Sequence, residues 1–464
     1  MNLHGKLFDL WAGPVNTAFG GEYRFEDGFA RHNTLPFNAV NTNSPFGNDF
    51  GGSLKILEGY AEADVPLLRD FVLAKAVDLD LAYRHTHQTN KDAITGNSKT
   101  LDFDTWKVSG TWDVIDGLRF RATRSRDVRA ASFVDLYYNL PDVIPGPPAG
   151  TVLNSWNLQA NGTATNDFTK IVYPPNFALK PEIGDTLTAG IVLQPRFIPG
   201  LRLSADYYDI KIKQAIVVLS AQQVVDACFN AGVVCDKIIS ATGAAFNTLP
   251  NSGRLDIANV IRGATNIGSF RQKGWDLELS YVLPLEKLSA SLPGRVTLRG
   301  LATITDSMKV NLGNGSGAIN YTNQTGGSAF GGFTAPSKYI LTGYFTYNVG
   351  GYGITFDGKC VPKGIYDIRR DASLPASNLN SINNNTVDSR FYLGISTSYK
   401  FGIGGDHTAE LFATVRNVFN VAPPNAVNNT SGTLGPVQGV GGPTNPVFYD
   451  TIGTQWRVGM RVAF

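Results

Sequence analysis

The sequence predicts an all-β protein, an antiparallel up-and-down transmembrane β-barrel with long extracellular loops and short periplasmic turns. Hydrophobic and polar residues alternate in segments of about ten residues, the length that a tilted strand needs to cross a bilayer. Short turns and long polar stretches join these segments in alternation. The composition agrees, because charged residues make up only 17% of the chain and glycine reaches 50 of 464 residues.

The alternation predicts strands along the whole chain. In each segment the apolar side chains share one face and the charged side chains fall almost entirely on the other. A strand between lipid and water has this period of two, so we predict that the apolar face contacts lipid. In chain order the apolar faces carry Val77, Leu79, Leu81 and Tyr83; Trp106, Val108 and Trp112; Leu118, Phe120 and Ala122; Trp275, Leu277, Leu279 and Tyr281; Val296, Leu298 and Ala302; and Leu411, Ala413 and Val415.

The connections alternate in length, which is typical of outer-membrane barrels. Tight turns are predicted near residues 13–14, 116–117, 200, 294, 350–351 and 404–405, with a longer turn over 66–75. Long loops are predicted over 26–52, 86–101, 130–180, 213–262, 305–336, 359–388 and 420–452. An aromatic residue often closes the apolar face before a short turn, which predicts an interfacial girdle of Trp112, Tyr281, Tyr347 and Tyr399.

The last segment gives the clearest strand. Its apolar face carries Trp456, Val458, Met460, Val462 and Phe464, and arginines occupy the other face. Arginines beside a water-filled lumen and an aromatic final residue indicate a barrel-closing terminal strand, through which we expect the barrel-assembly machinery to recognise the chain.

The number of strands has a consequence for the whole barrel. We predict about fifteen strands, whereas a complete single-chain bacterial barrel has an even number and both termini in the periplasm. The first residues also lack the basic and apolar regions of a signal peptide. Together these observations predict a partial barrel over residues 1–464, with strands missing at the front.

Charge and hydropathy exclude other classes. A net charge of +2 provides no basic field for nucleic acid. No apolar run approaches the roughly 18 residues of a membrane-spanning helix. The sequence contains no Walker loop, HExxH zinc motif or GxSxG nucleophile elbow, so we predict that the chain is not an enzyme and binds no cofactor.

Four stretches resemble the barrel of TonB-dependent receptors, in the order in which that family has them. The first, LRFRATRSRDVRAASFVDLYYN, departs from the family pattern at Ala131, where proline is usual. The residues that carry the resemblance are Arg129 and Ala130; Asn176, Leu179, Lys180, Pro181 and Glu182; Lys273 and Gly274; and Arg416, Asn417, Phe419 and Asn420.

Members of that family hold an amino-terminal plug domain inside a barrel of about 22 strands. Nothing in this sequence resembles a plug. The resemblance implies that the intact protein resides in the outer membrane of a Gram-negative bacterium, works with TonB and takes up a scarce nutrient such as a ferric siderophore, cobalamin or an oligosaccharide. A passive porin-like barrel or a binding or adhesion barrel is the alternative, and a soluble all-β enzyme is a more remote one.

The cysteines and histidines leave alternatives open. Cys228 and Cys235 lie in one predicted loop, where a surface disulfide suits an oxidising exterior, although two unrelated thiols remain possible. Cys360 has no predicted partner, and three cysteines do not suggest a zinc site. His85 and His87 could help to hold a metal ion or haem, but solvated residues at a strand end is the preferred interpretation. We name no substrate-binding residue.

Overall fold

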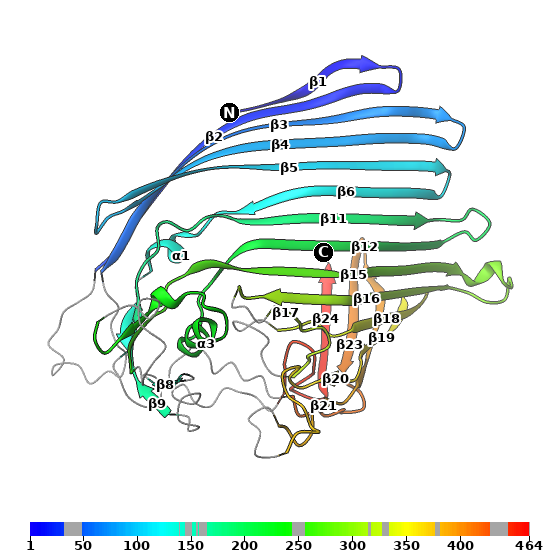
Figure 1. The fold of residues 1–464 in the computed structure, drawn as a ribbon. Coiled ribbons are helices and arrows are strands. Elements are labelled where there is room, and N and C mark those ends of the chain that lie inside the picture. Colours follow the sequence, from blue (N-terminus) through cyan, green and yellow to red (C-terminus); the bar gives the residue numbers. More distant parts are fainter. Residues whose placement is uncertain are drawn as a thin grey trace.

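The structure is a computed structural model that describes residues 1–31, 49–138, 140–143, 151–154, 156, 165–243, 256–313, 317–326, 334–375, 381–426 and 444–463. Its main element is an antiparallel sheet in which fifteen long strands neighbour one another in chain order (Figure 1). These strands are β1 (Asn2–Leu10), β2 (Gly13–Ala30), β3 (Phe50–Phe71), β4 (Ala74–Asp92), β5 (Ser98–Ile115), β6 (Leu118–Arg129), β11 (Glu182–Leu193), β12 (Leu201–Val217), β15 (Thr265–Pro284), β16 (Arg295–Asn311), β18 (Tyr339–Val349), β19 (Tyr352–Val361), β22 (Arg390–Gly404), β23 (His407–Arg416) and β24 (Gln455–Ala463).

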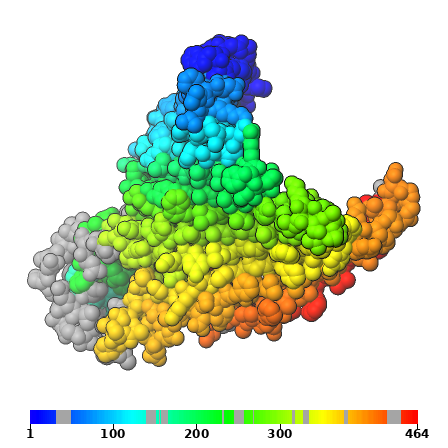
Figure 2. Space-filling model, turned by 90° about the vertical axis from the view of Figure 1, so that its right-hand side faces the viewer, coloured from blue at the N-terminus to red at the C-terminus, as the bar shows by residue number. Residues whose placement is uncertain are grey.

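The predicted number and order of strands are therefore confirmed. A short strand, β17 (Ala318–Asn320), pairs with the outer part of β16 as a sixteenth member of the sheet. Within the described residues, β1 pairs with β2 and β24 pairs with β23, and the two outer strands do not pair with each other. The first strands lie at the top of Figure 2 and the last strands at its lower right, so the sheet is open.

The short turns gather at one end of the strands, as the sequence predicts. They span residues 11–12, 72–73, 116–117, 194–200, 285–294, 350–351 and 405–406. The prediction of a longer turn over 66–75 is wrong, because β3 remains paired with β4 as far as Phe71. The prediction of a long loop over 86–101 is also wrong, since β4 and β5 stay paired out to Lys91 and Ser98 and only residues 93–97 connect them.

The other connections form a second layer of structure. They contain the helices α1 (Phe133–Tyr137) and α3 (Ala221–Ala231), the 3₁₀ turn η1 (Cys235–Lys237) and three small sheets, and η3 (Leu285–Lys287) lies in a short turn. Figure 1 shows α1, α3, β8 and β9 at the end of the large sheet opposite the tight turns. The small sheets consist of β13 (Ile238–Ser240), β14 (Ile257–Ile261), β10 (Lys170–Tyr173) and β7 (Leu140–Val143); of β8 (Thr151–Asn154) and β9 (Thr165–Phe168); and of β20 (Gly364–Ile365) and β21 (Thr386–Val387). No helix in the described part of the chain is both long and apolar enough to cross a membrane.

The middle of each long strand keeps the predicted alternation. Leu279 on β15 pairs with Leu203 and Gly300 on the apolar face, whereas Glu278 faces the other way beside Arg299. Aromatic rings bound the apolar band at both ends. On β5 the band runs from Trp106 to Trp112, which is roughly 20 Å along the strand.

The rings at the turn end bind the backbone of the turns. The indole of Trp112 donates a hydrogen bond to the Leu73 carbonyl (2.8 Å), and the hydroxyl of Tyr347 donates one to the Pro293 carbonyl (3.1 Å). Such rings, with an apolar body and a polar tip, suit the boundary between lipid and headgroups. We infer that the apolar band is the lipid-facing surface.

The two faces exchange polarity beyond the outer aromatic residues. Outward of Tyr207 and Trp275, the face that was apolar carries charged residues such as Lys211 and Arg271, which are cross-strand partners. The opposite face becomes apolar there, and Phe270 and Val310 pack into a buried core with the loops. The strands therefore continue past the membrane, where water covers their outside and folded loops cover their inside.

This register predicts where arginine is tolerated. Leu279 lies between Trp275 and Tyr281 on the lipid-facing side, so Leu279→Arg should destabilise the sheet by ~2–4 kcal/mol in bilayers. Thr297→Arg, on the inner face opposite Val282 and Thr346, should cost under ~1 kcal/mol. A urea titration of folding into lipid vesicles measures both values. Equal costs for the two variants would show that the faces have been assigned wrongly.

Candidate functional site

The inner face of the sheet collects charged side chains that pair across neighbouring strands. Arg119 binds Asp113 through two hydrogen bonds of 2.5 and 2.7 Å, and Arg121 binds Asp206 through two of 2.8 and 2.6 Å. These contacts join β5 to β6 and β6 to β12. Further pairs on this face include Lys107 with Asp80 (2.9 Å), Arg299 with Glu278 (2.9 Å), Arg461 with Glu410 (3.1 Å) and Arg69 with Asp78.

The pair of Arg121 and Asp206 crosses over the intervening strand β11. It can do so because the residue between them is Gly190, and a Cβ atom at that position would overlap the Asp206 carboxylate. Because Gly190 has no side chain, the space over β11 stays free, and two charged side chains on non-adjacent strands can meet there. Sequence alternation alone did not reveal this contact, since it joins residues 85 positions apart.

Three acidic residues of the inner face have basic partners on the same face. Asp78, Asp80 and Glu278, which could be read from the sequence as paired acids, each have a basic partner instead. Exposed ion pairs contribute only ~0–1 kcal/mol each, so their main effect is a hydrated, polar wall. Among the described residues, no group of three or more His, Cys, Asp or Glu side chains could hold a metal ion.

The mouth of this inner face is covered by a loop module with its own hydrophobic core. Val224 and Val225 of α3, Ile238 of β13 and Val260 of β14 are almost completely buried in it, together with Val310 from the outer part of β16. Arg262 is buried beside this core, where it donates hydrogen bonds to the Leu219 carbonyl (2.7 Å) and the Tyr173 hydroxyl (2.6 Å). The module is therefore a packed structure rather than a set of separate loops.

The structure joins Cys228 and Cys235 by a disulfide, with their Cα atoms 4.8 Å apart. The bond links α3 to η1 across Gly232, which ends the helix with a φ of 66° that favours glycine. Both cysteines belong to the buried core of the loop module. Cys360 is a free thiol on β19, on the same face as its cross-strand partners Leu341 and Phe391.

Burial changes the ionisation of acids in the loops. Removal of the Asp226 carboxyl from water raises its pKa, although a hydrogen bond from Gln222 (2.9 Å) acts in the opposite direction. Burial also disfavours ionisation of Asp135 at α1, but hydrogen bonds from Ser132 and Arg129 outweigh it and lower the pKa of that carboxyl. Burial raises the pKa of Tyr137 to about 12.

The residues predicted for the terminal strand lie on β24. Trp456, Val458, Met460 and Val462 share one face and pair with Val415, Ala413, Leu411 and Ala409 of β23. Phe464 lies outside the described residues. Because β24 is an outer strand of an open sheet, its role in closing a barrel stays a prediction.

His85 and His87 lie on the outer face of β4, beyond Tyr83, and each binds an aspartate of β5. The Nδ1 atom of His85 is 2.8 Å from Asp104, and that of His87 is 2.6 Å from Asp102. The preferred interpretation as strand-end residues in water agrees with their exposure. The two aspartates were missed in the sequence because the predicted loop separated them from the histidines.

The hydrophobic pattern of the sequence did not reveal the helices α1 and α3 in the long connections. Each begins with a capping box, in which the side chains of the first residue and of the residue three positions on cap each other's backbone. Ser132 and Asp135 form one, and Ser220 and Gln223 form the other. This short polar signal precedes an apolar run in each case, so the helices could have been found.

Comparison with protein families gives one match. The family model described as "TonB dependent receptor-like, beta-barrel" matches residues 2–418 of the chain. None of the curated proteins that were compared matches it.

Solved structures of similar fold cover nearly the whole chain. The FrpB iron transporter from Neisseria meningitidis (F3-3 variant) has a TM-score of 0.55 and 14% identity, over 99% of this chain and 53% of that one. A mutant of the ferric enterobactin receptor PfeA from Pseudomonas aeruginosa has a TM-score of 0.52 and 14% identity, over 98% and 60%. The copper transporter OprC has a TM-score of 0.52 and 12% identity, over 97% and 54%. At these identities the likeness shows the fold alone, and the present chain spans 53 to 60% of their length.

The disulfide predicts a measurable stabilisation of the loop module. The bonded cysteines are 7 positions apart, and closing so short a loop should stabilise the module by about 2.5 kcal/mol. Cys228→Ser with Cys235→Ser should therefore speed hydrogen exchange in α3, whereas Cys360→Ser, on β19, should leave it unchanged. Mass spectrometry of unreduced protein should also find the Cys228 and Cys235 peptides joined. Free alkylation of both thiols would contradict the bond.

Burial of Asp226 predicts a pH dependence of the same module. Because its folded pKa is raised above the unfolded value, its contribution to stability is fully present below the unfolded pKa. That contribution is lost as the pH rises through the folded pKa. Protection of α3 amides, corrected for intrinsic exchange, should therefore be greater near pH 4 than near pH 7. Asp226→Asn should remove this difference, and an unchanged difference in the variant would assign it to another group.

Proposed function

Since this chain belongs to the family of TonB-dependent receptor-like β-barrels, we propose that it is the barrel wall of an outer-membrane receptor. In this function the intact protein takes up a scarce nutrient across the outer membrane of a Gram-negative bacterium, with energy supplied through TonB. The observation that carries the proposal is the opposite polarity of the two faces of the sheet. An apolar band bounded by aromatic rings suits lipid, and a wall of paired charges suits a water-filled path.

The class of substrate follows from the similar structures only as a proposal. FrpB is an iron transporter, PfeA is a ferric enterobactin receptor and OprC is a copper transporter. These relatives support a metal or a metal chelate, of which a ferric siderophore is the first candidate. Cobalamin and an oligosaccharide are the other candidates in the class of scarce nutrients.

We further propose that residues 1–464 form part of a wider barrel. An outer strand in lipid leaves backbone N–H and C=O groups without partners, at a cost of several kcal/mol for each group. The open edges at β1 and β24 support additional strands that would remove this cost. A plug domain and a segment that binds TonB would belong to the same intact receptor, and β24 would be the strand presented to the barrel-assembly machinery.

The chemistry of the inner face supports transport rather than catalysis. Asp80, Asp113, Asp206 and Glu278 of this face each bind an arginine or a lysine, as suits a hydrated wall. The same ion pairs within the wall also support a second candidate function, that of a passive porin-like barrel. These pairs need no plug side chain to neutralise them, as would suit an open, water-filled pore.

Complementation tests the proposal. Residues 1–464, exported to the outer membrane of a strain that lacks its own siderophore receptors, should not restore growth on ferric siderophores. The chain produced together with the polypeptide encoded directly upstream should restore it, and deletion of TonB should abolish the effect. Uptake by the chain alone without TonB would establish the passive barrel instead. TonB-dependent uptake by the chain alone would show that it is already a complete receptor.

A further inference from the structure

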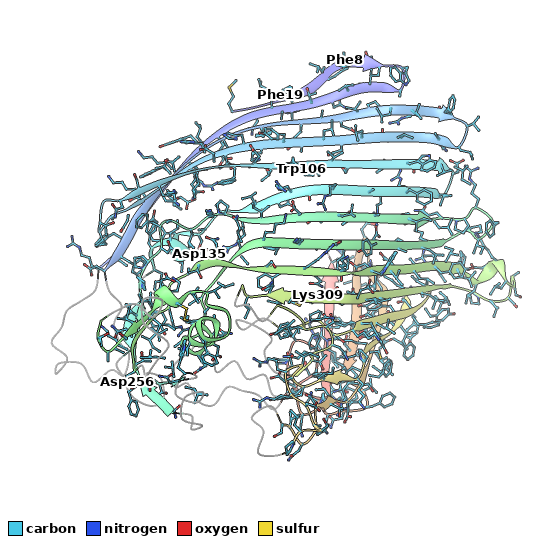
Figure 3. The ribbon with its side chains drawn as sticks, viewed as in Figure 1. Phe8, Phe19, Trp106, Asp135, Asp256 and Lys309 are labelled. Atoms are coloured by element: carbon cyan, nitrogen blue, oxygen red, sulfur yellow. A yellow bond between two sulfur atoms is a disulfide. The ribbon has the colours of Figure 1, made fainter. Side chains whose placement is uncertain are left out.

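A row that is rich in arginine and lysine crosses the outer face of the sheet, just beyond the aromatic residues that bound the apolar band. Cross-strand pairing places Trp106, Arg126, Asp185, Lys211, Arg271 and Lys309 in one continuous row over β5, β6, β11, β12, β15 and β16. Figure 3 labels the two ends of this row, Trp106 and Lys309. Adjacent rows add three more cations. We call the complete set the basic band: Arg124, Arg126, Lys211, Lys213, Arg271, Lys273 and Lys309.

The opposite side of the same strands shows that the basic band points away from the protein. Ile212, Phe270 and Met308, each next in sequence to a residue of the band, pack against the core of the loop module. Successive side chains of a strand point to opposite faces. The cations therefore face outward, and Arg124, Lys211, Arg271 and Lys309 are exposed.

Two carboxylates neutralise only part of this charge. Asp185 binds Arg126 (2.9 Å) and Lys213 (2.7 Å), and Asp209 binds Arg271 (2.6 Å) and Lys273 (3.4 Å). Arg124, Lys211 and Lys309 have no ion partner within the described residues. Seven cations and two carboxylates leave five positive charges in excess, and counting Asp306 at the neighbouring bulge still leaves four.

Two apolar grooves lie on the same face, on the membrane side of the basic band. One has a volume of about 890 Å³ and runs over β12 to β22, where Gly300, Gly343 and Gly358 form a row without side chains. The other has a volume of about 550 Å³ and lies over β3 to β15, where Gly110, Ala122 and Ala189 form a row of small residues. Trp275 lines the second groove directly below Lys273 and Arg271.

This arrangement matches an amphiphile with an anionic headgroup and several acyl chains. Arginine and lysine bind phosphate through charge-assisted hydrogen bonds, and cations beside a membrane surface each add about 1 kcal/mol of attraction to anionic lipid. The long side chains can reach from the interface to headgroup level. The grooves give the acyl chains a place that a free anion would not use.

We propose that the basic band and the two grooves below it form a binding surface for a phosphorylated glycolipid of the outer leaflet. The phosphates bind Arg124, Lys211 and Lys309, which have no ion partner, and the acyl chains lie in the grooves. The surface thus holds a specific lipid against the outside of the wall, apart from the transport path on its inside. This inference rests on the outer-membrane location in the proposed function.

The test uses the full chain folded in dodecyl maltoside micelles, with bound lipid counted by native mass spectrometry. The probes are lipid A with its phosphates, lipid A without phosphates but with the same acyl chains, and inorganic phosphate. Phosphorylated lipid A should bind about tenfold more tightly than the phosphate-free form, and the preference should fall with added salt. Inorganic phosphate at millimolar concentration should not displace it.

A pair of triple variants locates the site. Arg124→Gln with Lys211→Gln and Lys309→Gln should reduce the preference for phosphates to about twofold or less. Arg202→Gln with Lys287→Gln and Arg295→Gln removes three charges near the turn end of the sheet and should keep the tenfold preference.

Three outcomes would overturn the inference. An unchanged preference in the first triple variant would show that the basic band does not bind the phosphates. Displacement of lipid by inorganic phosphate would show an anion site without a lipid. Equal binding of the two forms of lipid A by the unsubstituted chain would show that the surface does not recognise phosphates. None of these outcomes contradicts the proposed membrane function, which the complementation experiment tests separately.

Discussion

Hydrogen bonding between neighbouring strands is the constraint on which the rest of this structure depends. A backbone that crosses lipid has no water to bind, so each N–H and C=O group must find a partner on the next strand. The fifteen long strands meet this demand by pairing in chain order without a crossover. Every strand except β1 and β24 is hydrogen-bonded to a neighbour on both sides. The side chains of a strand can therefore point only to the two faces of the sheet, toward lipid or toward the inside.

The surroundings on each side of the sheet determine whether that face carries polar or apolar side chains. These surroundings change along a single strand. On β15, Leu279 faces lipid between two aromatic residues, yet Arg271 on the same side lies where water begins. The inner side changes in the opposite sense, from Glu278, which pairs with Arg299, to Phe270, which packs under the loops. The backbone ladder is the same throughout, so this exchange marks the edge of the membrane without any change of secondary structure.

The loop module is stabilised differently from the membrane-spanning strands. It lies in water, so it needs a hydrophobic core of its own. That core combines α3, the short strands β10, β13 and β14 and the outer parts of β12 and β16. The disulfide between Cys228 and Cys235 links α3 to η1 within this module. The extended strands are therefore a platform on which the covering structure can fold, and the inner wall below keeps its paired charges.

The sequence by itself determined the number of strands, their order, the lipid-facing residues and the turn end of the sheet, because a period of two needs only neighbouring residues and the solvent on each side. It also indicated the pairing of Cys228 with Cys235, which are close in the chain. It did not determine that β4 and β5 continue through residues 86–92 and 98–101, because the hydrophobic signal weakens once lipid ends although the backbone ladder goes on. It could not give the pair of Arg121 and Asp206, the buried Arg262 or the row from Arg126 to Lys309. Those arrangements depend on the register between strands far apart in sequence, and only the tertiary structure fixes that register, through the hydrogen bonds and packing of all the strands together.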